Sequence, residues 1–374
     1  MLPRLLDRVG GTPLIDIDGV HVKMECANPG GSVKDRIAVF MLTEAMRRGD
    51  LYVGDTVVEA TSGNTGIALA LAARELGCRA LIFMPEHMSV ERRRMMVRAG
   101  AEVRLTPQAE SFAGACARRD EYHSRSGYWI PDQFTNPDNT RCHRETTGAE
   151  IVSQLLDRGV SRLGAFVAGV GTGGTLMGVG QALREAFSGV RVIAVEPTES
   201  AVMSGGSPGE HGIMGIGDGF IPGLIDMAQV DGVVCVSTAE AHAECARLRA
   251  HHGWCIGLSA GANLLAARRL HTHGLPVVTM WPDSADRYAS VGLDPPTAAT
   301  TCCPLAAACH QRMSALLETW QGEAEGVPGR TTSSVTVEVD LPRPQGTPQA
   351  QAGPCRGRAM QLRCGQLLPR LRLT

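Results

Sequence analysis

The sequence contains almost no lysine. Of its 36 basic residues only Lys23 and Lys34 are lysine, and all the others are arginine. Chemistry that requires a side-chain amine, such as a Schiff base, therefore has two candidates in this chain.

Other absences narrow the class of protein. No apolar run reaches the ~18 residues of a membrane-spanning helix, and the first residues lack a signal-peptide pattern. Twelve cysteines occur, but they form no Cys-x-x-Cys pair and no zinc-like Cys/His array, so we expect free thiols and no metal site. The net charge of −2 gives no reason to expect nucleic acid or a membrane as a partner. A cytoplasmic protein is the expectation that follows.

Short apolar runs alternate with longer amphipathic segments between residues 12 and 290. Helices are expected at 66–76 and 89–99, and another with Lys34 in its first turn. Strands are expected at 56–60, 80–84, 102–105, 165–168, 190–196, 232–236 and 277–281. This alternation is typical of βαβ units, and it predicts an α/β protein with mostly parallel sheets.

The composition changes near Pro295. Nine of the 21 prolines follow from there, and the only regular patterns are a helical one at 310–323 and a strand-like one at 333–341. We interpret residues 295–374 as a tail outside the catalytic core, partly disordered.

Residues 28–36, Asn-Pro-Gly-Gly-Ser-Val-Lys-Asp-Arg, place Lys34 in the first turn of an amphipathic helix. The positive end of the helix dipole disfavours protonation of an amine there, which suits a Schiff-base lysine. Taken alone, the pattern equally allows a solvated lysine paired with Asp35 or a nearby glutamate.

Three turns rich in small residues each follow an apolar stretch and precede a helix. They are Thr61-Ser62-Gly63-Asn64-Thr65-Gly66, Gly169-Val170-Gly171-Thr172-Gly173-Gly174-Thr175 and Gly257-Leu258-Ser259-Ala260-Gly261-Ala262. The first two favour binding of a carboxylate or phosphate by backbone amides and hydroxyls. The second is not a Walker loop and fits a dinucleotide fingerprint poorly, so a phosphate outside a nucleotide is favoured. The third could be no more than a helix capped by Ser259.

In this order, these segments resemble the cysteine synthase (O-acetylserine sulfhydrylase) and cystathionine β-synthase family, from about Gly11 to Ser290. The resemblance extends to Gly11-Thr12-Pro13-Leu14, 132–137 (Asp-Gln-Phe-Thr-Asn-Pro), 215–222 (Gly-Ile-Gly-Asp-Gly-Phe-Ile-Pro) and 282–288 (Pro-Asp-Ser-Ala-Asp-Arg-Tyr). It implies pyridoxal phosphate as cofactor and fold type II, two three-layer α/β domains with the cofactor in the cleft between them. The larger domain would comprise residues 1–27 and 138–294, and the smaller, mobile substrate domain residues 28–137.

The resemblance also implies roles for individual residues. Lys34 would carry the cofactor as a Schiff base and act as the catalytic base, whereas Lys23 would make no cofactor bond. Asn64 would contact the cofactor's 3′-oxygen, Gly171, Thr172, Gly173, Gly174 and Thr175 its phosphate, and Ser259 its pyridine nitrogen. Thr61, Ser62, Thr65 and Gln133 would hold the substrate carboxylate.

The implied reaction is β-replacement, in which O-acetyl-L-serine and sulfide give L-cysteine and acetate through an α-aminoacrylate. Family members leave alternatives open: O-phosphoserine or thiosulfate as substrates, or cystathionine β-synthase-type condensation of serine (or an activated serine) with homocysteine. A homodimer is expected. Serine acetyltransferase is a candidate partner, and a non-catalytic relative that only binds it is the alternative of another class. Asp218 departs from the small residue common in cysteine synthases, which puts the second substrate in question.

Overall fold

The computed structural model describes residues 6–61, 63–271, 274–288, 290, 292 and 293. The chain divides into two compact units, Met1–Gly326 and Val327–Thr374, and all described residues belong to the first. The predicted tail, with its helical and strand-like patterns, lies outside the described residues, and so does Ser62.

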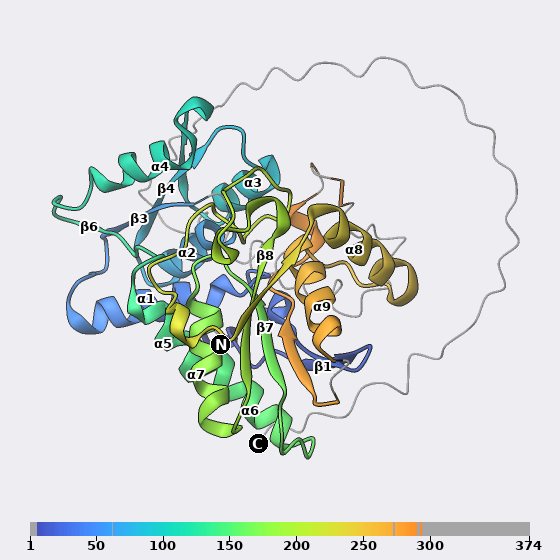
Figure 1. Ribbon diagram of the computed structural model, residues 1–374. Helices are drawn as coiled ribbons and strands as arrows, with labels where there is room; N and C mark the ends of the chain where they lie inside the picture. Colours follow the sequence, from blue (N-terminus) through green and yellow to red (C-terminus); the bar gives the residue numbers. More distant parts are fainter. Residues whose placement is uncertain (1–5, 62, 272–273, 289, 291, 294–374) are drawn as a thin grey trace, which may run out of the picture. The chain divides into compact units, whose positions relative to one another are not determined.

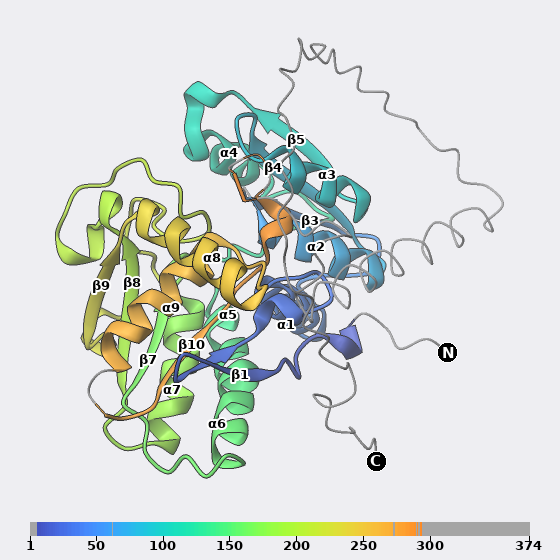
Figure 2. The same cartoon turned by 90° about the vertical axis from the view of Figure 1, so that its right-hand side faces the viewer.

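Two β-sheets form the framework of the first unit (Figures 1 and 2). The six-stranded sheet has the order β1-β2-β10-β7-β8-β9 and the four-stranded sheet the order β5-β4-β3-β6. The six strands are β1 (Leu14–Ile17), β2 (Val20–Lys23), β7 (Ala165–Gly169), β8 (Arg191–Pro197), β9 (Gly232–Val236) and β10 (Val277–Met280); the four are β3 (Thr56–Ala60), β4 (Arg79–Pro85), β5 (Glu102–Thr106) and β6 (Tyr128–Trp129). Only β1 and β2 pair antiparallel among the described strands, which confirms the predicted α/β class with mostly parallel sheets.

Helices cover both faces of each sheet. The α-helices are α1 (Lys34–Arg48), α2 (Asn64–Glu75), α3 (Val90–Arg98), α4 (Ser111–Asp120), α5 (Pro137–Cys142), α6 (Ala149–Leu156), α7 (Gly174–Ala186), α8 (Thr238–His252) and α9 (Leu258–His271). A π-helical turn, η4 (His143–Gly148), joins α5 to α6. Short 3-10 turns lie at Leu6–Arg8, Glu25–Ala27, Gln108–Glu110, Thr198–Ser200, Val202–Ser204, Met227–Gln229 and Ala285–Arg287.

Alternating side chains of the strands build a separate core on each face. In the large sheet, Val167 and Ile193 pack with α8 and α9, whereas Phe166 and Val192 pack with α6 and α7. In the small sheet, residues of β3 and β4 pack with α1, α2 and α3 on one face and with α4 on the other. Strands buried on both faces explain why the sequence shows continuous apolar runs instead of alternation.

The strands of the small sheet all lie between residues 28 and 137, and those of the large sheet outside that range. Parallel strands bring the turns after β3 and β7 to the carboxyl ends of their sheets, where α/β proteins place ligands. The mobility of the smaller half remains a prediction.

Candidate active site

Lys34 is the first residue of α1, and its side chain lines a cleft together with residues from segments next to both sheets. Burial lowers the pKa of Lys34, while the nearby carboxylates of Asp218 and Asp283 raise it. Within the described part of the chain the Lys34 amine makes no hydrogen bond or ion pair. It is therefore available to a ligand in the cleft.

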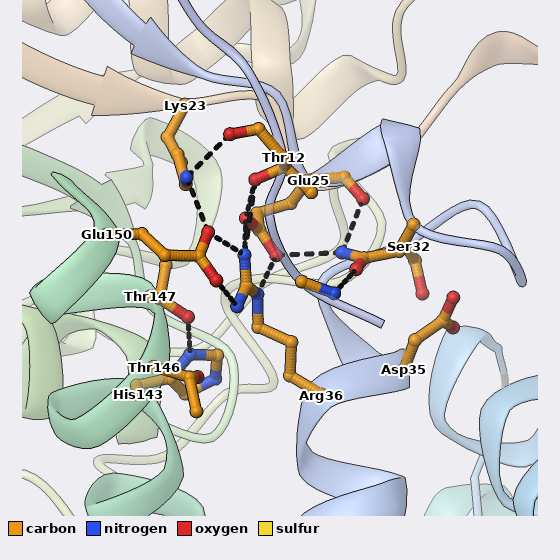
Figure 3. Close-up of polar contacts among 12 residues, drawn as sticks. Thr12, Lys23, Glu25, Ser32, Asp35, Arg36, His143, Thr146, Thr147 and Glu150 are labelled. Atoms are coloured by element: carbon orange, nitrogen blue, oxygen red, sulfur yellow. Dashed lines mark hydrogen bonds and ion pairs between the residues drawn. The ribbon is translucent and has the colours of Figure 1, made fainter. Parts of the chain in front are cut away.

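Lys23, the other lysine, is committed to structure (Figure 3). Its Nζ donates to the Thr12 carbonyl oxygen at 2.7 Å, to Glu150 Oε2 at 2.6 Å and to Gln154 Oε1 at 2.9 Å. Lys23 lines neither of the two pockets that Lys34 lines.

The turn between β7 and α7 is shaped for an anion. Gly173, the N-cap of α7, has φ +87°, a left-handed conformation that glycine adopts without strain. A Cβ on Gly171 would lie 2.4 Å from the Gly215 carbonyl oxygen, so only glycine fits there. The free N–H groups at the start of this 13-residue helix adjoin the pocket that Gly171, Thr172, Gly173 and Thr175 line.

Asn139 of α5 fixes this turn from behind. Its Nδ2 donates to Thr172 Oγ1 at 3.0 Å and to the Gln133 carbonyl oxygen at 2.8 Å. One buried amide thus links Thr172, predicted to contact the cofactor phosphate, to Gln133, predicted to hold the substrate carboxylate.

His143 fixes the other threonine of the turn. Its Nε2 lies 3.1 Å from Thr175 Oγ1, and its Nδ1 lies 2.9 Å from Thr147 Oγ1. Burial lowers the pKa of His143 well below its ordinary value, so the ring is neutral. A neutral ring orients the Thr175 hydroxyl without adding charge beside the anion site.

Asn64, the first residue of α2, is held at both ends of its amide. Arg287 Nη1 donates to Asn64 Oδ1 at 2.7 Å, and Asn64 Nδ2 donates to Asp283 Oδ2 at 2.6 Å. Tyr288 donates its hydroxyl to the same Asp283 oxygen at 2.6 Å. Asp283 and Arg287 are each 1% exposed, so the amide is fixed with one N–H of Nδ2 still free to donate.

Ser259 is the second residue of α9 and lines the same pocket as Lys34 and Asn64. Because α9 begins at Leu258, Ser259 lies inside the helix and is not its N-cap. The neighbouring Asn263 accepts from the Gly169 N–H at 2.8 Å and donates to the Met280 carbonyl oxygen at 3.0 Å, which ties α9 to the end of β7.

The residues predicted to hold the substrate carboxylate line the adjoining pocket. Thr61, Thr65 and Gln133 lie there beside Lys34, and Thr65 Oγ1 donates to Gln133 Oε1 at 2.7 Å. This bond fixes the Gln133 amide so that its NH₂ group remains to donate. Ser62, predicted with them, is outside the described residues.

A family model described as pyridoxal-phosphate dependent enzyme matches residues 5–283. The chain belongs to this family.

Two kinds of comparison agree with that assignment. A cysteine synthase of Staphylococcus aureus is 42% identical over 296 residues, which covers 76% of this chain and 94% of the relative. The structure of an O-acetylserine dependent cystathionine beta-synthase from Helicobacter pylori matches with a TM-score of 0.74 and 36% identity, over 78% of this chain and 99% of that one. A cysteine synthase structure from Entamoeba histolytica matches with a TM-score of 0.73 and 33% identity, over 84% and 96%.

The cleft of this pyridoxal-phosphate family member fits the cofactor. It offers an unpaired amine, an anion site at a helix N-terminus and an oriented amide donor, contributed by Lys34, the 171–175 turn and Asn64. In addition, the buried Asp283 Oδ1 has no hydrogen-bond partner among the described residues. The roles given to these side chains remain predictions. The structure places each predicted site residue that it describes in the lining of the cleft or next to it. Gly174, which begins α7, is the one that adjoins the lining residues.

Sequence reasoning missed five residues that line the pocket or hold its lining by hydrogen bonds, namely Asn139, His143, Asn263, Asp283 and Arg287. Only the last two lay in a segment that carried the resemblance. His143 begins a π-helical turn, and such turns are frequent at functional sites. This signal is visible only in the structure.

Among the described residues no group of three or more His, Cys, Asp or Glu side chains could hold a metal ion, and no helix is long and apolar enough to cross a membrane. Five of the seven cysteines in the described part of the chain are buried.

Proposed function

We propose that this enzyme makes L-cysteine from O-acetyl-L-serine and sulfide by β-replacement. The observation that carries the proposal is the position of Lys34, unpaired and between an anion-binding turn and a second group of donors. The identity to a cysteine synthase over most of both chains supports it.

Several residues of the cleft have a task in this reaction. Gln133, with its NH₂ group left free by Thr65, and the hydroxyl of Thr61 bind the carboxylate of the amino acid. When bound, pyridoxal phosphate supplies the electron sink that allows the Cα–H bond to break. The Lys34 amine, uncharged more readily because it is buried, accepts the Cα proton and later returns it.

Ser259 tunes the chemistry at the other end of the cofactor site. A serine hydroxyl cannot keep a pyridine nitrogen protonated as a carboxylate would. A serine at this position would therefore leave the bound cofactor a weaker electron sink, which would favour loss of acetate from Cβ.

The experiment is a product assay with purified holoenzyme, with O-acetyl-L-serine and sulfide in one arm and L-serine with L-homocysteine in the other. We expect L-cysteine in the first arm, and none with a Lys34→Ala variant. Turnover confined to the second arm would replace the proposal by cystathionine formation from L-serine.

Assembly and location stay predictions of the resemblance. We propose a cytoplasmic homodimer in which residues 28–137 form a mobile half. Serine acetyltransferase is its candidate partner. Light scattering of the purified enzyme, alone and mixed with that protein, tests both associations.

A further inference from the structure

Asp218 lies in the substrate pocket without a role in the reaction above. It follows Gly215 and Gly217 in the loop between β8 and β9, and it lines the pocket together with Lys34, Thr65 and Gln133. Its Oδ2 would lie 4.0 Å from a Cβ on Gly171, which places the carboxylate beside the turn that precedes α7.

The Asp218 carboxylate makes no hydrogen bond and no ion pair with the residues that the structure describes. By contrast, three buried carboxylates have partners: Glu25 accepts from Arg36, Glu59 from Arg119, and Glu196 from two backbone N–H groups. Burial raises the pKa of Asp218, whereas Lys34 and His211 lower it. Asp218 is an exposed residue, and because its unpaired carboxylate lines the pocket, it can accept a hydrogen bond from a positively charged ligand bound there.

The wall of the pocket beside Asp218 is aromatic. Phe112 and Phe134 line it, with ring centroids 6.3 Å apart, and Phe134 lies 5.4 Å from Phe220. Phe220 is 45% exposed, so these rings lead from the pocket toward solvent. Aromatic faces accept both a short aliphatic chain and a positive charge.

We infer that Asp218 selects the second substrate, favouring a thiol whose short carbon chain carries an ammonium group and disfavouring anionic sulfur donors such as thiosulfate. This inference rests on the proposed function and specifies the nucleophile of the same site. Neutral hydrogen sulfide is not repelled by the Asp218 carboxylate and remains a substrate.

The reaction with such a thiol is balanced. The Cβ–O bond of O-acetyl-L-serine breaks and acetate leaves with the electron pair, while the thiolate sulfur forms the Cβ–S bond with its own pair. The Cα proton taken by Lys34 returns to the same carbon, and the thiol proton leaves to solvent. The products are an S-substituted cysteine, acetate and one proton.

Three thiols of nearly equal size test the charge preference: cysteamine (positive), 2-mercaptoethanol (neutral) and mercaptoacetate (negative). Holoenzyme is mixed with O-acetyl-L-serine until its absorbance changes, and the rate at which each thiol restores the spectrum is measured by stopped flow. For each thiol, the rate constant of the wild type is divided by that of Asp218→Asn. The intrinsic reactivity of the thiol cancels in this ratio.

We expect a ratio of about ten for cysteamine, about one for 2-mercaptoethanol and about one tenth for mercaptoacetate, since one local charge contact shifts affinity by roughly that factor. Equal ratios for the three thiols would overturn the inference, because Asp218 would then act on the thiol proton or on the fold. Glu210→Gln is the matched control: it removes one negative charge from an exposed side chain that lines neither pocket, and its three ratios should stay near one.

Two further arms keep the result interpretable. If Asp218→Asn does not retain cofactor, Asp218→Ser, with the small residue expected of cysteine synthases, takes its place. If O-acetyl-L-serine leaves the spectrum unchanged, the proposed function fails; β-chloro-L-alanine then serves as the donor, and the same three ratios decide on Asp218.

Discussion

Lys23 and Lys34 are both withdrawn from water, yet their amines have opposite surroundings. Lys23 has three acceptors within 2.9 Å, whereas Lys34 has none in the described part of the chain and faces the cleft. Burial lowers the pKa of both amines. The two lysines therefore differ less in the pKa of their amines than in whether the amine is available to a ligand in the cleft.

Lys34→Ala should abolish covalent attachment of the cofactor and all turnover, because Lys23, the only other lysine, lines neither pocket. Lys23→Arg, the matched control, keeps the positive charge beside Glu150 and should keep the cofactor. Borohydride reduction followed by peptide mapping reports the attachment site directly. Cofactor label on the peptide that contains Lys23 would disprove the assignment.

A second residue-scale prediction concerns pH. Burial raises the pKa of Asp35 to about 7, although Arg287 and the Gly30 N–H lower it. The folded state then binds more protons than the unfolded chain between pH ~4 and ~7, so stability falls as the pH rises through this window. Asp35→Asn keeps an acceptor for the Gly30 N–H and removes the titration.

We expect Asp35→Asn to be more stable than the wild type at pH 8, by up to about 4 kcal/mol, with the gap closing toward pH 4. Urea unfolding of both proteins at pH 4, 6 and 8 measures this gap. A pH-independent difference would mean that Asp35 does not titrate in this range.

At the scale of elements, a buried charge network joins the start of the chain to α1 and α6 (Figure 3). Arg36 of α1 donates to Glu25 at 2.6 Å and to Glu150 of α6 at 2.7 Å, and Lys23 of β2 reaches the same Glu150. The positive charges of Lys23 and Arg36 balance the negative charges of Glu25 and Glu150. Burial by itself raises the pKa of Glu150, but the hydrogen bonds from Arg36 and Lys23 outweigh it and hold that pKa at about 2.

Glu25→Gln should destabilise the fold by about 3–5 kcal/mol, because it leaves Arg36 with a net charge and too few acceptors in a dry site. Glu102→Gln is the control. It breaks an ion pair with Arg104 whose side chains are 61% and 49% exposed, and it should cost less than about 1 kcal/mol. Denaturant unfolding of the two variants compares them. If the two variants lose similar amounts of unfolding free energy, the charge network is not what anchors α1.

The elements that the sequence predicts well are the long apolar strands and the helices after glycine turns. Strand 232–236 agrees at both ends with β9, and strand 56–60 with β3. The second helix begins at Asn64 instead of 66, because Gly63 serves as its N-cap. Buried parallel strands are recognisable because both of their faces must be apolar.

Two elements were missed for physical reasons. The β1–β2 hairpin has strands of four residues, too short for a periodic pattern, although Asp18-Gly19 with φ of 51° and 81° is a typical hairpin turn that could have indicated it. β6 has two residues and forms only by pairing with β3. In the site, Asn64 meets Arg287 across 223 positions, a contact that no local pattern contains.

At the scale of the whole molecule, everything that forms the cleft belongs to the first compact unit. Both sheets and every residue lining the two pockets lie before residue 289, and the family match ends at 283. The segment from 295 onward is proline-rich and poor in periodic apolar sequence. The chemistry should therefore be independent of that segment.

Deletion of residues 295–374 should leave cofactor content and sulfide-dependent turnover nearly unchanged and shift the melting temperature by no more than a few degrees. The reason is that the described apolar cores of both sheets are built from residues up to Leu293, and the sequence after them offers little periodic apolar pattern. Thermal melting, size-exclusion chromatography and the cysteine assay compare the truncated and full-length enzymes. If the full-length enzyme is dimeric and the truncated enzyme is monomeric or aggregated, the segment belongs to the fold or to the subunit interface. In that case turnover per bound cofactor would show whether the active site depends on that assembly.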